Sequence, residues 1–400
     1  MAVKSGYKQT EVGVVPDDWE VSYVGDSFVV CNQLRLPLSQ SVRERMSGSY
    51  PYYGPTSVQG WINEYRVEGK YALIGEDGDH FLKWRSQPMT LLAEGKFNVN
   101  NHAHLVKGTK NLTEWFYWYF VNRDLTSHLT RQGASRYKLT KATLLQIPCV
   151  LPNLTEQRAI AAALSDVDAL LGALERLLVK KRDLKQASMQ QLLTGQTRFP
   201  GFDGKWEVKS LKAIIQTPVT DGPHLTPRFW DNGIPFLSVN NLAGNRIDLT
   251  DLRFISEADH ELFSRKCKPR KDDILLGKAA SVGKVAIVEL DYEFNIWSPI
   301  ALIRVGSEYS ARFVYYQLQS ADLIGQITLL TNTSSQGNIG MGDIEKLTLK
   351  LPPLPEQTAI ATVLSDMDAE LAALEQRLTK TRALKHGMMQ ELLTGRTRLL

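Results

Sequence analysis

The chain has few cysteines and no long apolar run, and these absences exclude several classes of protein. Its three cysteines, Cys31, Cys149 and Cys267, lie more than 100 residues apart along the 400-residue chain. This spacing excludes a disulfide framework or a zinc knuckle and favours a reducing compartment, which we take to be the cytoplasm. No apolar run reaches the roughly 18 residues of a membrane span, so no membrane partner is expected. The net charge of +4 neither requires nor excludes a nucleic acid partner.

Aromatic residues are missing from two segments, 151–198 and 351–398, although the whole chain contains 35 of them. The two segments are copies of one another at a constant offset of 200, with 30 of 48 positions identical. Both begin with Leu-Pro-x-Leu-x-Glu-Gln and both end with Leu-Leu-Thr-Gly-x-Thr-Arg. Because this period is far longer than that of solenoid or propeller repeats, the chain is a duplicated half-protein.

Each copy predicts one long helix. No proline follows the opening prolines, so the helices can run from near Thr155 and Pro355 until Gly195 and Gly395 stop them. Roughly 39 residues rising ~1.5 Å each would span about 58 Å. Apolar residues alternate at spacings of four and three, which is typical of a coiled-coil seam. The predicted seam contains Ile160, Leu164, Val167, Leu171, Leu174 and Leu178 in the first helix and Ile360, Leu364, Met367, Leu371, Leu374 and Leu378 in the second.

An amphipathic helix lying on a globular core is the alternative interpretation. The length of the helices, their lack of aromatic residues and their shared phase favour a helix pair instead. Each helix leads away from the domain that precedes it, so an antiparallel pair is the economical arrangement.

The intervening segments are more distantly related to each other. Leu73-Ile74-Gly75 resembles Leu275-Leu276-Gly277, and Trp19-Glu20-Val21 matches Trp206-Glu207-Val208. Short strands are expected at 71–74, 103–107, 273–276, 284–288 and 300–305. The predicted fold class is therefore α+β, with two similar globular domains separated by two long helices that pack as an antiparallel coiled coil with internal pseudo-twofold symmetry. The expected segments are domain one at 1–150, helix one at 151–199, domain two at 200–350 and helix two at 351–400.

The two copies have diverged unequally. The helices remain nearly identical, which indicates one task done twice, such as binding the same partner. The domains have drifted apart, which indicates two versions of one task, such as reading two ligands. Duplex DNA has dyad symmetry, so such a chain can present inverted readers to two half-sites.

The repeated motifs resemble those of the DNA-specificity subunit of type I restriction–modification systems. Asn100–His104, Thr220–His224 and Gly233–Val239 are also typical of that family. The resemblance implies two target-recognition domains, each reading half of an asymmetric bipartite site in double-stranded DNA. It also implies that the helices set the spacing and dock two methyltransferase subunits, with endonuclease/translocase subunits as further partners. The chain itself would be non-catalytic and would need no cofactor.

Motifs for catalysis in this chain are weak. Its only Pro-Pro, Pro352-Pro353, precedes Leu354 and does not match the Asn/Asp-Pro-Pro-Tyr/Phe turn of adenine methyltransferases. The run from Gly277 to Lys284 has five residues between its glycines and Val285 after the lysine, whereas a P-loop needs four and then Ser or Thr.

Two further groups have a structural alternative. Asp203 with Glu207 and Lys209 suggests a metal-dependent nuclease, but the match to Trp19-Glu20-Val21 favours an entry strand. His102 and His104 could ligate a metal, yet no further cysteine or histidine lies nearby, so a hydrogen-bonded turn is favoured.

Two polar loops at equivalent places are the candidates for DNA contact, because base edges and phosphates are bound by Arg, Lys, Asn, Gln, Ser and Thr. The predicted contacts are Arg131, Gln132, Arg136 and Lys138 in domain one, and Lys278, Ser281, Lys284, Ser334, Ser335, Gln336 and Asn338 in domain two. A solvated surface loop is the alternative for each. Residues 1–150 carry a net charge of +3 and residues 201–350 a net charge of −1, so domain two needs a segregated basic face.

Two other functions compete with DNA reading. The chain could be an adaptor whose helices and domains bind only proteins, in which case no DNA sequence preference is expected. It could also be a self-sufficient nuclease or methyltransferase, which would modify DNA alone when given Mg²⁺ or S-adenosylmethionine.

Overall fold

The structure is a computed structural model that describes residues 5–132, 136–332 and 337–399. It consists of two compact units. Unit 1 comprises residues 1–175 and 376–400, and unit 2 comprises residues 176–375. Each unit therefore contains one globular domain and part of both long helices. Within the described ranges, no helix is long and apolar enough to cross a membrane.

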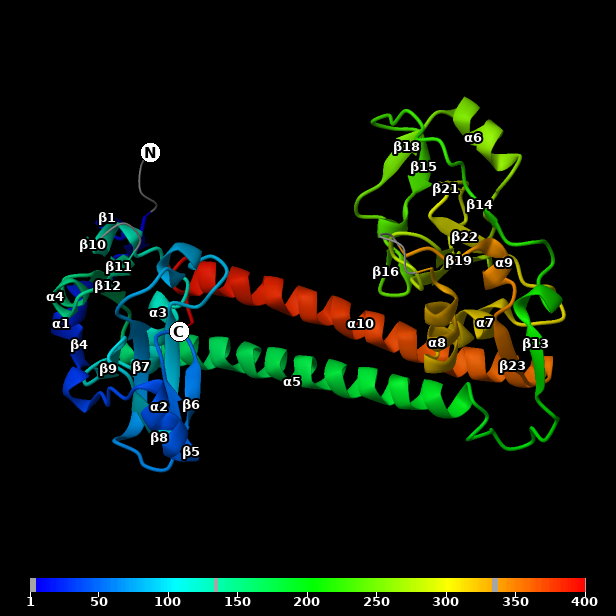
Figure 1. Cartoon of the computed structure of the whole chain (residues 1–400). Coiled ribbons are helices and arrows are strands. Elements are labelled where there is room, and N and C mark those ends of the chain that lie inside the picture. The colour runs from blue at the N-terminus through cyan, green and yellow to red at the C-terminus, as the bar shows by residue number, and fades with distance from the viewer. Residues whose placement is uncertain (1–4, 133–135, 333–336, 400) are drawn as a thin grey trace. The chain divides into compact units, whose positions relative to one another are not determined.

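Unit 1 is built on a six-stranded sheet with the order β4-β9-β7-β8-β5-β6 (Figure 1). Neighbouring strands are antiparallel except β5 and β8, which are parallel. The sheet strands are β4 (Phe28–Val30), β5 (Ser47–Tyr53), β6 (Val58–Ile62), β7 (Val67–Gly75), β8 (Thr90–Val99) and β9 (Ala103–Gly108). The antiparallel pairs beside it are β1 (Tyr7–Thr10) with β2 (Gly13–Pro16), β3 (Glu20–Tyr23) with β12 (Pro148–Leu151) and β10 (Thr130–Gln132) with β11 (Arg136–Lys138).

Short helices complete unit 1. They are α1 (Val24–Ser27), α2 (Gln40–Arg45), α3 (Thr113–Phe120), α4 (Lys141–Leu145) and the 3₁₀-helices η1 (Asn32–Leu34), η2 (His80–Lys83) and η3 (Thr126–His128). The aromatic helix α3 packs on β7, β8 and β9. Its Trp115 meets Trp19 edge to face at 5.7 Å between ring centroids, and both side chains are buried. The aromatic residues that the long helices lack are thus concentrated in the domain core.

Unit 2 contains a four-stranded antiparallel sheet with the order β14-β22-β19-β20. A three-stranded sheet, β18-β15-β21, adds one parallel pair between β15 and β21. These strands are β14 (Thr220–Asp221), β15 (Ile234–Leu237), β18 (Arg253–Ile255), β19 (Ile274–Gly277), β20 (Val285–Ile287), β21 (Asn295–Ile296) and β22 (Ile300–Ile303). Two further pairs are β13 (Glu207–Ser210) with β23 (Thr348–Leu351) and β16 (Leu242–Ala243) with β17 (Arg246–Ile247).

The helices of unit 2 are α6 (Glu257–Ser264), α7 (Ala311–Gln317), α8 (Ala321–Leu330), α9 (Met341–Ile344) and the 3₁₀-helices η4 (Leu211–Ala213) and η5 (Val239–Asn241). Each of the five strands predicted from the sequence overlaps an observed strand, namely β7, β9, β19, β20 and β22. Gly75 pairs with Ala103 in unit 1, and Gly277 pairs with Ile300 in unit 2. The resemblance between Leu73–Gly75 and Leu275–Gly277 therefore reflects equivalent central strands.

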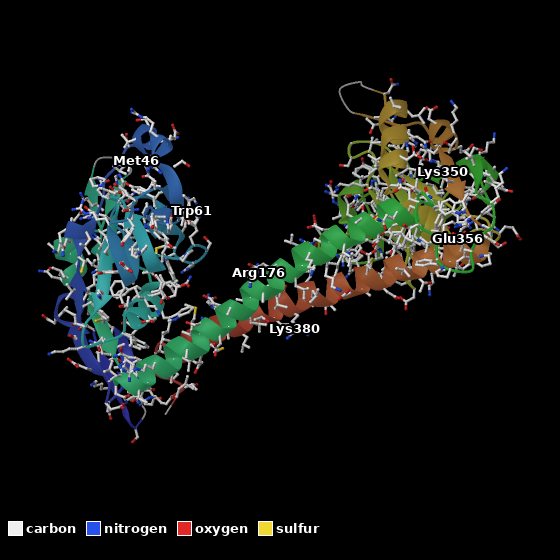
Figure 2. All side chains as sticks on the ribbon, turned by 90° about the horizontal axis from the view of Figure 1, so that it is seen from below. Met46, Trp61, Arg176, Lys350, Glu356 and Lys380 are labelled. Atoms are coloured by element: carbon white, nitrogen blue, oxygen red, sulfur yellow. The ribbon has the colours of Figure 1, made fainter. Side chains whose placement is uncertain are left out.

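The two long helices are α5 (Leu154–Leu192) and α10 (Leu354–Leu392), each of 39 residues. Both begin one residue before the predicted start. Gly195 and Gly395 follow with φ angles of +73° and +69°, a backbone conformation that glycine adopts without strain. Figure 2 labels Glu356 near the beginning of α10 and Lys350 on the strand β23 that leads into it.

Within each unit the two helices run antiparallel. In unit 1, Asp168 and Glu175 of α5 pair with Lys385 and Arg382 of α10, the latter pair at 2.7 Å. In unit 2, Lys185 pairs with Asp368 at 2.6 Å and Arg182 pairs with Glu375 at 2.7 Å. Residue numbers rise along one helix as they fall along the other, so the predicted antiparallel pairing is confirmed. The pairs of unit 2 also repeat those of unit 1 at an offset of 200.

The predicted seam residues are all buried or half-buried. Fully or nearly fully buried are Ile160, Leu164, Leu174, Leu178, Ile360, Leu364, Leu371 and Leu378, and half-buried are Val167, Leu171, Met367 and Leu374. Ile160 and Leu164 share a core with Leu392 in unit 1. Ile360 and Leu364 share one with Leu192 in unit 2. The beginning of one helix and the end of the other are therefore parts of a single domain core in each unit.

Buried ion pairs fix this arrangement. The guanidinium of Arg398 binds both oxygens of Glu156 at 2.6 and 2.8 Å. The side chain of Glu156 is fully buried and also accepts a hydrogen bond from Nε1 of Trp19 at 3.1 Å. In unit 2, Arg198 binds the fully buried Glu356 at 2.8 and 2.6 Å. The repeated Glu-Gln and Gly-x-Thr-Arg motifs thus join the beginning of one helix to the segment that follows the other.

Candidate nucleic-acid interface

The polar loop of domain one forms the hairpin β10–β11. Arg131 is exposed, and its Nη2 donates to the hydroxyl of Tyr137 at 3.2 Å while its guanidinium lies 5.5 Å from the centre of the same ring. This contact holds a basic group on the exposed side of the hairpin. Gln132 and Arg136 are paired with each other in the two strands, and their side chains lie outside the described residues.

Lys138 belongs to an ion-pair cluster at the base of this hairpin. Oε1 of Glu76 lies 3.4 Å from Nζ of Lys138, and Oε2 of Glu76 lies 2.5 Å from Nη1 of Arg35. We call Arg35, Glu76 and Lys138 cluster 1. Burial alone would raise the pKa of Glu76, but hydrogen bonds from the two cations outweigh it and hold that pKa below its ordinary value. Glu76 is therefore a carboxylate at neutral pH.

The backbone of Glu76 also holds the hairpin to the sheet. Its carbonyl oxygen accepts a hydrogen bond from the amide of Leu139 at 2.7 Å, and its own amide donates to the carbonyl of His102 at 2.7 Å. The amide of Gly78 donates to the carbonyl of Tyr137 at 3.1 Å. The hairpin is thus fixed at its base by both main-chain and side-chain contacts.

The two histidines form hydrogen bonds rather than a metal site. His104 is fully buried, with Nδ1 2.8 Å from Nδ2 of Asn32 and Nε2 2.8 Å from the carbonyl of Leu139. Burial lowers the pKa of His104, which agrees with a neutral ring that accepts at Nδ1 and donates at Nε2. His102 lies 2.9 Å from the carboxylate of Asp77. The described parts of the chain contain no group of three or more His, Cys, Asp or Glu residues placed to hold a metal.

In unit 2, Lys278 occupies the position equivalent to Glu76. Its amide donates to the carbonyl of Pro299 at 2.8 Å, and its carbonyl accepts from the amide of Ile339 at 2.9 Å. These two bonds reproduce those of Glu76 with His102 and Leu139. One backbone framework therefore carries an acid in unit 1 and a base in unit 2.

The ammonium of Lys278 is buried in an ion pair instead of projecting from the surface. It lies 3.1 Å from Oδ2 of the fully buried Asp221, while Lys266 lies 2.5 Å from Oδ1. We call Asp221, Lys266 and Lys278 cluster 2. Burial opposes ionisation of Asp221, but the two neighbouring ammonium groups prevail and lower its pKa. Because Lys278 is committed to Asp221, the structure does not favour it as a direct DNA contact.

Three other predicted contacts of domain two, Ser281, Lys284 and Asn338, lie on turns beside cluster 2. Lys284 and Asn338 are exposed, and Ser281 is half-buried. A tight turn connects Gly277 and Lys284, whose carbonyl accepts from the amide of Gly277 at 2.7 Å, with Ala280 at a φ of +61°. Asn338 bridges to Ala279 and accepts from the amide of Asn332 at 2.9 Å. Ser334, Ser335 and Gln336 lie outside the described residues.

Sequence reasoning missed several polar and aromatic groups. In unit 2, the guanidinium of Arg228 lies 4.4 Å from the ring centre of Trp230, and that of Arg253 lies 4.9 Å from Phe229. Both arginines and Trp230 are exposed. The alternation of basic and aromatic residues in Arg228-Phe229-Trp230 is the signal that could have indicated them.

Unit 1 has a comparable exposed aromatic group on the hairpin β5–β6. Trp61, labelled in Figure 2, is 56% exposed and borders a hollow of about 620 Å³ together with Arg43 and Gln59. The guanidinium of Arg43 donates to the carbonyl of Gln59 at 2.7 Å. Arginine beside an exposed aromatic ring is suited to stacking and phosphate contact. No sequence pattern distinguished Trp61 from the other aromatic residues.

The groups considered for catalysis have structural roles. Burial raises the pKa values of Cys149 and Cys267 to about 12, so neither is a ready nucleophile. Lys209 binds Glu207 at 2.8 Å and the hydroxyl of Tyr309 at 3.0 Å. Both residues lie on β13, which pairs with β23, as the entry-strand interpretation predicts.

Comparison with known proteins identifies the same family in both halves of the chain. Residues 16–180 and 203–381 match the type I restriction modification DNA specificity domain. A putative type I restriction enzyme specificity subunit from Haemophilus influenzae is 26% identical over 85% of each chain. The EcoBI specificity subunit from Escherichia coli is 24% identical over 88% of this chain and 77% of its own. The crystal structure of an S subunit from M. genitalium has the same fold, with a TM-score of 0.66, 15% identity and 98% coverage of both chains.

Proposed function

The chain belongs to the type I restriction modification DNA specificity family, and on this premise we propose that its two domains read the two halves of one bipartite DNA site. It is a specificity subunit of a type I restriction–modification system and is not itself catalytic. In the proposal, residues 1–150 and 200–350 are the two target-recognition domains. The helical segments 151–199 and 351–400 set the distance between the half-sites. The complex acts in the cytoplasm.

One observation carries the proposal. The backbone framework that holds the loop of domain one, through His102 and Leu139, recurs in domain two through Pro299 and Ile339. The side chain at its centre changes from Glu76 to Lys278, and the exposed polar groups around it differ as well. A conserved framework with different polar groups is the arrangement expected when two domains recognise different sequences in the same way.

The partners follow from the same premise. Double-stranded DNA is the ligand, and two methyltransferase subunits are proposed to dock on the two copies of the helical repeat. The near identity of those copies supports one subunit type bound twice. Endonuclease/translocase subunits would join this assembly to cut unmodified DNA.

A competition gel shift tests the proposal. The chain and its methyltransferase partner are mixed with a labelled library of random duplexes, and the bound fraction is sequenced. We expect enrichment of two short sequences that differ from each other and lie at a fixed separation. A bound fraction without sequence preference would instead support the adaptor function, in which the chain connects proteins only.

A matched test addresses the enzymatic alternative. The purified chain is incubated with DNA and either Mg²⁺ or S-adenosylmethionine, without any partner. We expect neither cleavage nor methylation. Transfer of a methyl group by the chain alone would contradict its assignment as a non-catalytic subunit.

A further inference from the structure

Clusters 1 and 2 occupy equivalent places in the two units. Cluster 1 surrounds the residue after Gly75 and cluster 2 surrounds the residue after Gly277, where the central strands β7 and β19 end. Each cluster is bonded to a residue that directly follows a predicted DNA contact, since the amides of Leu139 and Ile339 donate to the carbonyls of Glu76 and Lys278.

The two clusters have the same composition although their residues come from different elements. Each has one carboxylate and two cations, and each carboxylate oxygen faces one cation. In cluster 1 the carboxylate is Glu76, with Arg35 on one oxygen and Lys138 on the other. In cluster 2 it is Asp221, with Lys266 on one oxygen and Lys278 on the other.

In each cluster one cation is deep and the other lies at the rim. The side chains of Arg35 and Lys278 are 18% and 11% exposed, whereas those of Lys138 and Lys266 are 28% and 50% exposed. The deep cation is committed to the carboxylate. The rim cation shares the carboxylate but keeps access to solvent on its other side.

Each cluster therefore has one positive charge more than its carboxylate neutralises. At cluster 1 the nearby carboxylate of Asp77 faces His102 at 2.9 Å. At cluster 2 the exposed His224 lies 3.2 Å from Oδ2 of Asp221. The extra cation of each cluster can therefore bind one singly charged anion, through a charge-assisted hydrogen bond.

We propose that Lys138 and Lys266 each bind a phosphodiester of the DNA backbone, one at each half-site, and that Glu76 and Asp221 position them. This inference rests on the proposed function. Lysine is a compact charge with freely rotating donors, which suits phosphate more than the directional edge of a base. The two phosphates would fix each domain on the duplex, while the protruding loop residues read sequence.

The experiment measures how the affinity of the chain with its methyltransferase partner depends on salt. Two duplexes of equal length are compared, one with the mapped recognition site and one of random sequence. For Lys138→Met and for Lys266→Met, the slope of log K against log[salt] should become shallower by about 0.9, the contribution of one phosphate contact. The ratio of affinities for the two duplexes should stay as in the wild type.

Control variants remove a positive charge at the far end of β9, the neighbour of β7, and at the far end of β19. Lys110, beyond the far end of β9, and Lys271, ahead of β19, are exposed. Lys110→Met and Lys271→Met should leave the slope unchanged. The charge-preserving variants Lys138→Arg and Lys266→Arg should retain most of the wild-type slope. Because Lys266 is half-exposed, its substitution decides the result if Lys138→Met does not fold.

Each other outcome overturns the inference. An unchanged slope for Lys266→Met would mean that no phosphate is bound there. A shallower slope accompanied by loss of the affinity ratio would mean that the lysines read bases. If the wild-type complex itself fails to discriminate the two duplexes, the proposed function has failed, and that result differs from either of the others.

Discussion

Glu76 and Lys278 occupy equivalent backbone positions but carry opposite charges, so each needs neighbouring side chains of the opposite charge. Glu76 and Lys278 would each be unstable in place without the opposite charges that surround them, because a buried charge without a partner costs several kcal/mol. In unit 1 the partners come from the segment after η1 and from the hairpin β10–β11. In unit 2 the partner of Lys278 is Asp221 on β14, which also binds Lys266 from the segment after α6.

The substitution Asp221→Asn should destabilise unit 2 by about 3 kcal/mol at pH 7, because it leaves Lys278 buried without a counter-charge. The folded-state pKa of Asp221 is lowered below its ordinary value of 3.8, so its ionisation stabilises the protein above that pH. That stabilisation is lost as the pH falls below 3.8 through the lowered pKa. Urea unfolding at pH 7 and at pH 3 measures both effects.

The difference in free energy of unfolding between wild type and Asp221→Asn should therefore be smaller at pH 3 than at pH 7. Asp248→Asn is the matched control, since Asp248 is half-buried and its Oδ1 accepts hydrogen bonds from Thr250 within a local turn rather than from a cation. A difference between Asp221→Asn and wild type that does not change with pH would show that the charge of Asp221 is not what stabilises cluster 2.

Among the structural elements, the long helices were the most predictable from sequence and the loops the least. Both helices begin within one residue of their predicted start, because periodicity, proline position and a terminal glycine are local signals. The parallel pairing of β5 with β8 could not be predicted, since it depends on contacts between strands that are distant in sequence. The burial of Lys278 was missed for the same reason, because its partner Asp221 lies 57 residues earlier in the chain.

The junctions at the ends of the helices should contribute more to stability than the ion pairs along them. Glu156 is fully buried and binds Arg398 and Trp19, whereas Glu175 is half-exposed where it meets Arg382. We expect Glu156→Gln to cost about 2 kcal/mol, because the buried charge-assisted hydrogen bonds with Arg398 and Trp19 are weakened, while Arg398 keeps its second partner, Asp18. Glu175→Gln should cost less than about 1 kcal/mol, as for other exposed ion pairs.

Thermal unfolding followed by circular dichroism compares these two variants. Glu356→Gln, which disrupts the equivalent pair with Arg198, should resemble Glu156→Gln. Equal losses of stability in Glu156→Gln and Glu175→Gln would contradict the view that the repeated Glu-Gln and Gly-x-Thr-Arg motifs anchor the helices.

For the whole molecule, the proposed function assigns the helices the role of a ruler. Adding one heptad to both α5 and α10 preserves their seam and lengthens each by ~10 Å, or roughly three base pairs at ~3.4 Å each. The preferred gap between the half-sites should grow accordingly, while the two half-sites themselves stay the same. Selection from random duplexes measures the new gap.

A seven-residue insertion in the turn between β1 and β2 is the control, because it adds the same number of residues without lengthening a helix. This variant should retain the original gap. If the heptad variant also retains it, the helices do not set the spacing, even if the domains read DNA.

The most direct test of the central claim is adenine-methylation mapping of DNA modified by this chain together with its methyltransferase partner. We predict one asymmetric bipartite motif with a fixed gap. Replacing residues 331–338 with a glycine-serine loop should change or abolish one half of the motif and leave the other half intact. A motif that is continuous, or that is the same with and without this chain, would contradict the account.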